Sequence, residues 1–263
     1  MKKILLFLLS VLTVSVSYAW IPHYDEGVLL FATKYLTPQA KSAFVDYLGE
    51  EYNDDVKYLY NLEKKRVAQH TKEIHYVHLG KDLKIADVEG DDAVTALEEA
   101  LAVVRNHKSH EKAEVVKALR TAIDLMCDVH NLSHFRIEGV EHSYKDFAFY
   151  RVRWEYGGKT DQRAKYKWST LWTSFASRHP GYSGALWVED MQLSSGNQYD
   201  KYAKGTLREW IEHNGSISAS YLDIITPECT MNLVAFNEME YVDYEMMVKA
   251  GYRLAALLNE TLK

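Results

Sequence analysis

The sequence predicts an all-α protein built as one multi-helix domain with at most a small hairpin. Three observations support this prediction: helical periodicity dominates, strand-like alternation is scarce, and no linker-like or low-complexity run divides the chain. Hydrophobic residues make up 47% of the 263 residues, which is enough to bury a sizeable core, and only four prolines and 13 glycines interrupt the pattern. We therefore expect a single domain over residues 20–263.

The first 19 residues have the form of a secretory signal peptide. Lys2 and Lys3 precede an apolar segment, and Ser-Tyr-Ala at 17–19 offers small residues at the cleavage positions. The apolar segment is short for a membrane span, although a signal anchor is the alternative, and no later segment is apolar for long enough to cross a bilayer. Cleavage after Ala19 would give an exported protein, periplasmic or secreted, that begins with Trp20.

The charge balance argues against one class of protein. Removal of Lys2 and Lys3 would lower the formal net charge from −6 to −8. A chain with this net negative charge is not expected to bind nucleic acid through overall electrostatic attraction to the phosphates. Bound cations would offset the negative charge locally.

The two cysteines leave two interpretations open. Cys127 and Cys229 could form one disulfide in an oxidising compartment, which export would provide. Alternatively, Cys127 is a small core residue of a buried helix.

Three helices are expected in the first part of the domain. Residues 25–35 show helical spacing of apolar side chains. Thr37 followed by Pro38 is a capped helix start with proline at the first position, and this helix runs to Gly49. Residues 54–67, dense in Tyr and Lys, form the third helix. The first helix turns four apolar residues inward: Val28, Leu29, Phe31 and Ala32.

The middle of the chain contains one ambiguous segment and two clear helices. Residues 74–79 are rich in β-branched side chains and form a strand or an extended loop. Asp91 or Asp92 caps a helix that extends to about residue 106, and Glu111 begins a long helix.

The remaining third is irregular at first and then helical. Residues 135–166 are irregular and aromatic, with a turn at Gly157 and Gly158 and a hairpin expected at 147–154. Helical patterns return over four ranges: 167–177, 190–213, 216–222 or beyond, and 242–262.

Residues 117–134, at the end of the long helix, carry the strongest chemical signal. Asp124 and Asp128 are four residues apart and share one helix face, and His130 and His134 follow at once. Unpaired charge on a buried helix is costly, and a metal ion bound by Asp oxygens and His nitrogens would remove that cost. The alternative is that the acids cap or form salt bridges and the histidines lie in a surface turn. Burial of this helix is implied by its apolar residues: Ala118, Leu119, Ala122, Ile123 and Met126.

Several stretches resemble the secreted zinc-dependent nucleases that cleave single strands, a family that shares its fold with bacterial zinc phospholipase C. They are YLTPQAKSAFVDYLG (35–49), HTKEIHYV (70–77), CDVHNLSHF (127–135) and KAGYRLAALLN (249–259), in the family's order. The resemblance implies a nuclease and phospholipase C-like all-α fold, up to three zinc ions, and metal-assisted hydrolysis of phosphodiester bonds. It implies single-stranded nucleic acid or nucleotides as substrate; phospholipase C-like hydrolysis is the alternative.

The resemblance also implies a set of metal ligands. In the family, the mature chain begins with a Trp whose amine and carbonyl chelate a metal, and Trp20 would take that role. Asp128 matches the metal-bridging carboxylate, which makes it a catalytic residue. His75 and His134 match ligands of different ions.

Two further family roles fall on nearby residues. Glu63 and Arg66 match an upstream acidic ligand and the Arg that steadies the phosphate, so Arg66 would also be catalytic; Asn61 and Lys64 fit these two roles less well. Tyr76 lies where an aromatic ring stacks on a base, a contact available to any base.

Four positions depart from the family pattern. Asp25 and Asp124 stand where the family has histidines, although His23 lies close to the first position. Ser169 and Thr173 replace a His and an Asp and are poor ligands. One ion is therefore badly supported, which favours a second function class: a catalytically silent member of the family that binds a ligand or partner.

The lost ligands could be replaced from another loop. His142 and Asp146 form a His-x-x-x-Asp pair that could supply them. A ligand set shifted from imidazole to carboxylate also favours harder divalent cations over zinc. We therefore expect fewer zinc ions than three, or a harder divalent cation, at this site.

Overall fold

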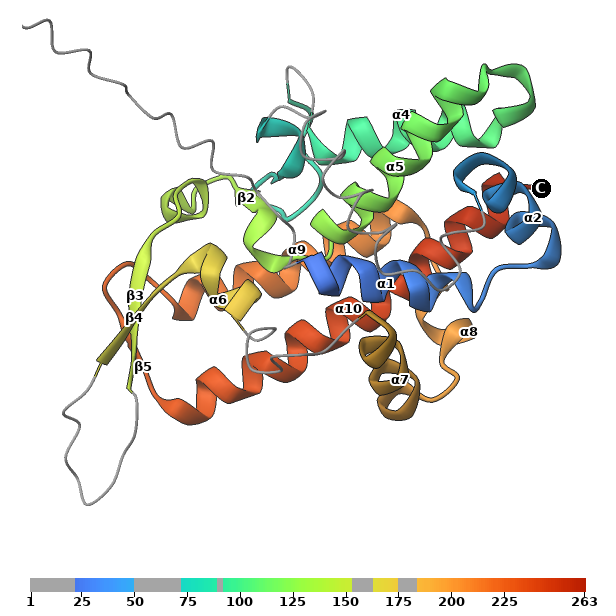
Figure 1. Ribbon diagram of the computed structural model, residues 1–263. Helices are drawn as coiled ribbons and strands as arrows, with labels where there is room; N and C mark the ends of the chain where they lie inside the picture. Colours follow the sequence, from blue (N-terminus) through green and yellow to red (C-terminus); the bar gives the residue numbers. More distant parts are fainter. Residues whose placement is uncertain (1–21, 50–71, 89–91, 153–162, 175–183) are drawn as a thin grey trace, which may run out of the picture.

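The computed structural model describes residues 22–49, 72–88, 92–152, 163–174 and 184–263 (Figure 1). This part of the chain is mainly helical, which confirms the predicted class; the more specific nuclease-like fold stays a prediction. The α-helices are α1 (Pro22–Thr33), α2 (Pro38–Leu48), α4 (Ala93–Arg105), α5 (Lys112–Asp128), α6 (Trp168–Ser174), α7 (Gly184–Ser195), α8 (Tyr199–Tyr202), α9 (Leu207–Ile224) and α10 (Leu233–Thr261). Four 3-10 helices join them: η2 (Lys72–His75), η3 (His107–Ser109), η4 (Leu132–His134) and η5 (Glu141–Tyr144).

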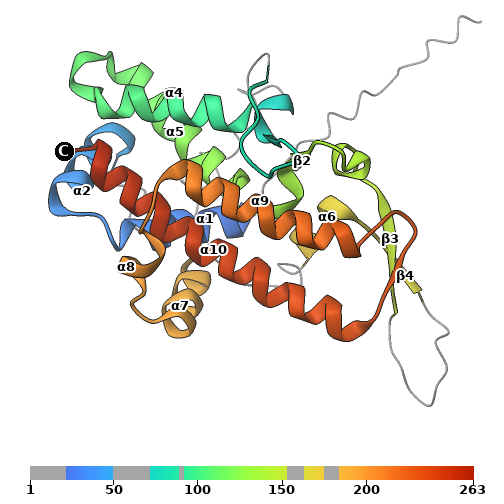
Figure 2. The ribbon, with the colours of Figure 1, turned by 180° about the vertical axis from the view of Figure 1, so that it is seen from behind.

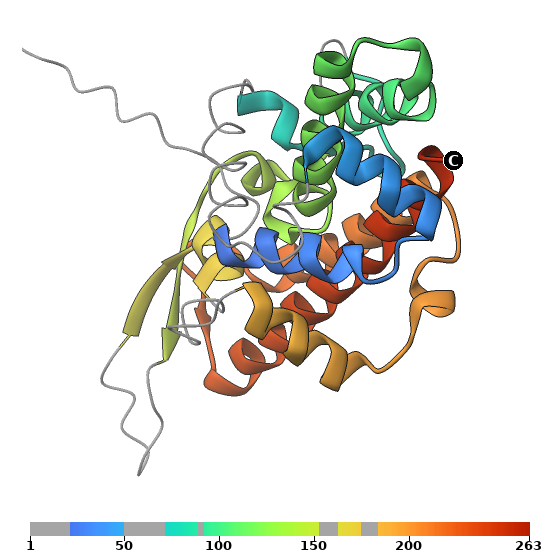
Figure 3. The same cartoon turned by 45° about the vertical axis from the view of Figure 1, so that its right-hand side comes forward.

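Helices α1, α5 and α10 meet at the centre of the molecule. α1 packs against α7, α10 and α5, while α4 covers α5 on another side. Figure 3 shows α1 crossing the middle of the molecule, with α7 on one side and α5 on the other. The four apolar residues predicted to face inward from α1 are all buried. The largest fully buried side chains are Trp168, Trp172, Trp187, Tyr252, Phe31, Phe44, Phe135, Phe149 and Phe236.

The described residues contain more sheet than the one hairpin that the sequence predicts. β1 (Val77–Leu79) pairs in parallel with β2 (Phe135–Ile137). β3 (Ala148–Val152) pairs antiparallel with β4 (Arg163–Lys167) at one edge of the molecule, and β5 (Thr230–Met231) adds in parallel to β3 (Figure 1). β1 lies within residues 74–79, for which the sequence predicts a strand or an extended loop. Because β2 and β5 have only two or three residues and pair with distant segments, local periodicity could not reveal them.

The prediction of one helix over 190–213 is wrong. The structure ends α7 at Ser195, inserts α8, and begins α9 at Leu207. Gly196, directly after α7, has a φ of 58°, in the left-handed region that ends a right-handed helix, and Gly205, just before the N-cap of α9, has a φ of 104°. α9 then continues through the separately predicted segment 216–222.

Other expected boundaries hold or shift. Thr37 caps α2 and Asp92 caps α4, through side chains that accept hydrogen bonds from the backbone N–H groups of Ala40 and Thr95. α10 begins at Leu233, nine residues before the expected start, because Asn232 caps it there. The predicted signal peptide and the helix expected at 54–67 lie outside the described residues.

The structure bears on the cysteine pairing and on whether a helix could span a membrane. Cys127 and Cys229 are both free thiols, and Cys127 is fully buried in the core, so the disulfide interpretation is not supported. None of the helices in the described ranges combines the length and apolar character that a membrane crossing requires.

Candidate metal centre

Helix α5 carries two fully buried acids. Asp124 and Asp128 are both 0% exposed and lie one turn apart on a helix whose other buried residues are mostly apolar. The helix ends at Asp128, and the chain turns into η4. Asn131 fixes this turn, because its side-chain oxygen accepts a hydrogen bond of 2.9 Å from the backbone N–H of Ser133. The turn places His134 back beside the end of α5.

The parallel pair β1–β2 brings a second histidine to the same place. His75 ends η2 just before β1, and His134 ends η4 just before β2. The register pairs Val77 with Phe135, so the two histidines lie at the same end of the sheet. A histidine 53 positions before Asp128 thereby reaches it: His75 Nδ1 lies 2.6 Å from Asp128 Oδ2.

The ligand atoms of three residues gather tightly. His75, Asp124 and Asp128 each offer one atom, and these atoms all lie within 4.8 Å of one another. Ligands that share one ion at about 2.0–2.2 Å must lie roughly this close to each other. We call these three residues the His-Asp-Asp cluster. Their nitrogen and oxygen donors fit a divalent transition-metal ion, and the two carboxylates shift the preference toward harder cations.

A fourth residue touches the cluster through Asp128. His134 Nδ1 lies 3.1 Å from Asp128 Oδ1, and both atoms are buried. Within the described ranges neither atom makes a well-aligned hydrogen bond. Asp128 therefore turns one oxygen to each imidazole.

The charge state of Asp128 suits a metal ligand. Burial raises the pKa of its carboxyl group, but the neighbouring His134 and His75 outweigh burial and hold the pKa well below its usual range. Asp128 is therefore ionised at neutral pH, as metal binding requires.

His130 lies two residues after Asp128, but both of its ring nitrogens are hydrogen-bonded to residues outside the cluster. Its Nδ1–H donates to the Met126 carbonyl oxygen at 2.7 Å, and its Nε2 accepts from Arg253 at 2.9 Å. Burial, and then the charge of Arg253, hold the pKa of His130 well below its usual value. Both ring nitrogens are thus occupied, and the residue braces the end of α5 rather than offering a metal ligand.

An aromatic and cationic pair lies next to the histidines. The Tyr76 ring is 5.5 Å from the His134 ring, and the guanidinium carbon of Arg136 lies 3.7 Å from the Tyr76 ring centroid. Tyr76 is predicted from the sequence as a site residue, but Arg136 is not. Arg136 lies in β2 opposite His78, and only the strand register, which local sequence does not reveal, could have identified it.

Several predicted site residues are not in the His-Asp-Asp cluster. Asp25 is buried on α1, which packs against α5, but its oxygens do not belong to the group within 4.8 Å. His142 Nε2 lies 3.0 Å from the Leu222 carbonyl oxygen, and Asp146 accepts the backbone N–H of Ser169 at 2.9 Å. His142 and Asp146 therefore contact α9 and the start of α6 through these hydrogen bonds, and they do not join the cluster.

The remaining predicted site residues lie outside the part of the chain that the structure describes. Trp20, Glu63 and Arg66, with the weaker alternatives Asn61 and Lys64, lie outside the described residues, as do the side chains of His23 and Thr173.

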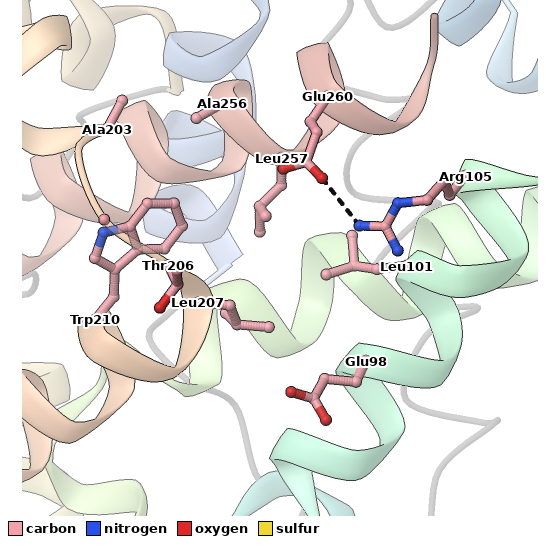
Figure 4. A pocket seen from close by; sticks show the side chains of 11 residues that line it. Glu98, Leu101, Arg105, Ala203, Thr206, Leu207, Trp210, Ala256, Leu257 and Glu260 are labelled. Atoms are coloured by element: carbon pink, nitrogen blue, oxygen red, sulfur yellow. Dashed lines mark hydrogen bonds and ion pairs between the residues drawn. The ribbon is translucent and has the colours of Figure 1, made fainter.

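A cavity of about 460 Å³ lies elsewhere, between α4, the start of α9 and the end of α10 (Figure 4). Leu101, Leu257 and Trp210 contribute apolar surface, and an ion pair of 3.1 Å between Arg105 and Glu260 lies at its edge. The cavity shares no residue with the His-Asp-Asp cluster. Its volume alone therefore does not make it the candidate site.

Comparison with protein-family models gives no match, and comparison with curated proteins gives none either.

Proposed function

We propose that the chain is an exported metal-dependent phosphodiesterase that hydrolyses single-stranded nucleic acid or nucleotides. The observation that carries this proposal is the buried His-Asp-Asp cluster, with His134 against the second oxygen of Asp128. Carboxylate and imidazole groups gathered in this way are the usual ligands of divalent cations, and the charge of a cation would offset the cost of burying two acids. The resemblance to zinc nucleases supports the same chemistry.

The residues of the cluster have distinct roles in this proposal. Asp128 is the shared ligand, because its Oδ2 faces His75 and its Oδ1 faces His134. Asp124 adds a second carboxylate from one turn earlier on α5. Divalent ions held there would lower the pKa of a water molecule and stabilise the charge that develops on the phosphate.

Tyr76 and Arg136 would contact the substrate. The Tyr76 ring is half-buried and lies beside His134, so a base that stacked on it would lie next to the proposed metal ligands. Arg136 covers the Tyr76 ring at 3.7 Å and carries a positive charge that can pair with a phosphate. A base stacked at Tyr76 favours nucleic acid over phospholipid as the substrate.

A hydrolysis assay tests the proposal. Single-stranded DNA and RNA are incubated with the protein and added zinc, manganese or calcium. We expect cleavage that falls at least about 100-fold in Asp128→Ala and in His134→Ala. Glu114→Ala, which removes an exposed acid from the same helix, is the matched control and should retain full activity. Cleavage that persists in Asp128→Ala would refute the metal mechanism.

Phospholipid is the second substrate arm of that assay. Hydrolysis of phospholipid without cleavage of nucleic acid would favour the phospholipase C-like alternative.

Metal analysis of protein purified without chelators should find substoichiometric zinc or an oxygen-preferring cation, because two of the three clustered ligands are carboxylates. Three tightly held zinc ions per chain would contradict this assignment.

A catalytically silent binding protein is the second candidate function. It is favoured by the positions of His142 and Asp146, which make structural hydrogen bonds instead of replacing the missing ligands. No turnover of either substrate under any of the three ions would support it.

A further inference from the structure

Two buried cations lie on one face of α10. Arg253 is 5% exposed and Lys249 is 6% exposed, one helical turn apart. Burial lowers the pKa of Arg253 to about 10, so its guanidinium still carries a positive charge at neutral pH. Buried charges of this kind are usually paired with an opposite charge, because leaving them unpaired is costly.

The partners of Arg253 are neutral. Its Nη1 donates to His130 Nε2 at 2.9 Å and to the Asn214 side-chain oxygen at 3.2 Å, and its Nε donates to the Tyr202 carbonyl oxygen at 3.3 Å. Among the residues that the structure describes, no carboxylate forms an ion pair with Arg253, and Nη2 makes no hydrogen bond.

Among the described residues, Glu245 is the carboxylate that forms an ion pair in this region. Lys249 Nζ lies 3.1 Å from Glu245, whose side chain is 46% exposed, and the Tyr202 hydroxyl also donates to Glu245 at 3.4 Å. A third cation, Lys201, lies over the Tyr202 ring, with Nζ 4.7 Å from the ring centroid. We call Lys201, Lys249 and Arg253 the cationic cluster; within the described ranges it carries two positive charges more than Glu245 neutralises.

One side of the cationic cluster faces solvent. α8, α9 and α10 lie together on one face of the molecule (Figure 2). Lys201 and His213 are exposed, while Lys249 and Arg253 are buried. Burial, followed by the charges of Lys249 and Arg253, lowers the pKa of His213, so this exposed ring lies within the field of the cluster.

We propose that the cationic cluster binds a phosphate group, as inorganic phosphate or as part of a larger ligand. A tetrahedral oxyanion offers several acceptors, and charge-assisted hydrogen bonds from ammonium and guanidinium groups are the strong ones. The low local dielectric strengthens each of these contacts. The site shares no residue with the His-Asp-Asp cluster and does not depend on the proposed hydrolysis.

Calorimetric titration with inorganic phosphate tests the proposal. The full chain is treated with a chelator, so that no metal binds phosphate, and ionic strength is held constant with sodium chloride. We expect saturable binding of one phosphate per chain. Lys249→Met should weaken it about tenfold or more, because a charge-assisted donor is lost from a buried position. Lys204→Met is the matched control, since it removes an exposed lysine from the same segment, and should bind as the wild type does.

Further variants keep the test decisive if Lys249→Met does not fold. Lys201→Met should also weaken binding, and phosphate should raise the His213 pKa followed by NMR in the wild type. Asp128→Ala should bind phosphate unchanged. Four outcomes would overturn the proposal: no saturable binding, equal binding by Lys249→Met or Lys201→Met, loss of binding in Asp128→Ala, and binding of acetate as tightly as phosphate.

Discussion

At the scale of single residues, Asp128 shows how one side chain can organise a site. Its two oxygens face two histidines that end separate 3-10 helices, η2 and η4, and it is fully buried. Replacement by a neutral residue would leave two imidazoles close together without the charge that orients them. Asp128 is therefore both the proposed shared metal ligand and the negative charge that faces the two histidines.

Gly215 is a residue whose size is fixed by its neighbours. It lies in α9 where β1 and β2 approach, and a Cβ atom there would overlap the Leu79 side chain and lie 3.2 Å from Phe135. We predict that Gly215→Val lowers the free energy of unfolding by about 2 kcal/mol or more, because overpacking a tight core forces it apart. Urea denaturation measures this change. Ser220→Val, at an exposed position of the same helix, should stay within about 0.5 kcal/mol; equal losses in both variants would contradict the packing argument.

Tyr35 should make stability depend on alkaline pH. Burial, followed by a contact of 3.4 Å with the Tyr252 hydroxyl, raises the Tyr35 pKa to about 12. The unfolded chain loses this proton near pH 10 while the folded protein keeps it, so stability falls as pH rises from 10 toward 12. Tyr35→Phe should fall less steeply over this range in urea denaturation. The exposed Tyr241→Phe is the control and should follow the wild type.

At the scale of elements, the start of α9 shows local sequence overriding a longer pattern. Thr206 accepts the Glu209 backbone N–H, and the Glu209 side chain accepts the Thr206 backbone N–H, which completes a capping box. Gly205 precedes this box with a φ of 104°. The helix therefore begins here although apolar spacing on either side suggests a continuous helix.

Removal of this cap should destabilise the protein measurably. We predict that Thr206→Ala costs about 1 kcal/mol in the free energy of unfolding, because a backbone N–H of the first turn loses its partner. Thr206→Ser keeps the hydroxyl and should cost much less. If both variants unfold at the same urea concentration, the cap contributes nothing.

Capping residues made some helix boundaries predictable and others not. α2 and α4 were predictable because Thr37 and Asp92 are capping residues beside a helical pattern. The break between α7 and α9 also has local signals, Gly196 and the Thr206 capping box, but the apolar spacing on either side outweighs them and predicts one continuous helix. Strands as short as β1 and β2 exist only through their pairing with each other.

At the scale of the whole molecule, the candidate site depends on tertiary assembly. Asp124 and Asp128 share α5, so their spacing alone predicts that they lie together. His75 reaches them only through the β1–β2 pair, and the sequence suggested it only by resemblance to a family. Arg136 carried no signal that residue spacing could reveal.

Because the cluster forms only in the folded chain, metal binding should stabilise the whole molecule. We predict that a divalent cation at about 100 times its dissociation constant adds about 2.7 kcal/mol, or roughly 5–10 °C in melting temperature. Differential scanning calorimetry with and without chelator measures the shift. Glu114→Ala should show the same shift and Asp128→Ala none; a shift that survives in Asp128→Ala would place the ion elsewhere.

The parallel register of β1 and β2 has a consequence for folding. Slippage by one residue would turn every side chain of a strand to its opposite face and displace His134 relative to His75 by about 3.3 Å. Three-residue strands have few hydrogen bonds with which to resist such an error. If the proposed cation is held by His75 together with Asp124 and Asp128, it would favour chains in which the two strands are correctly paired.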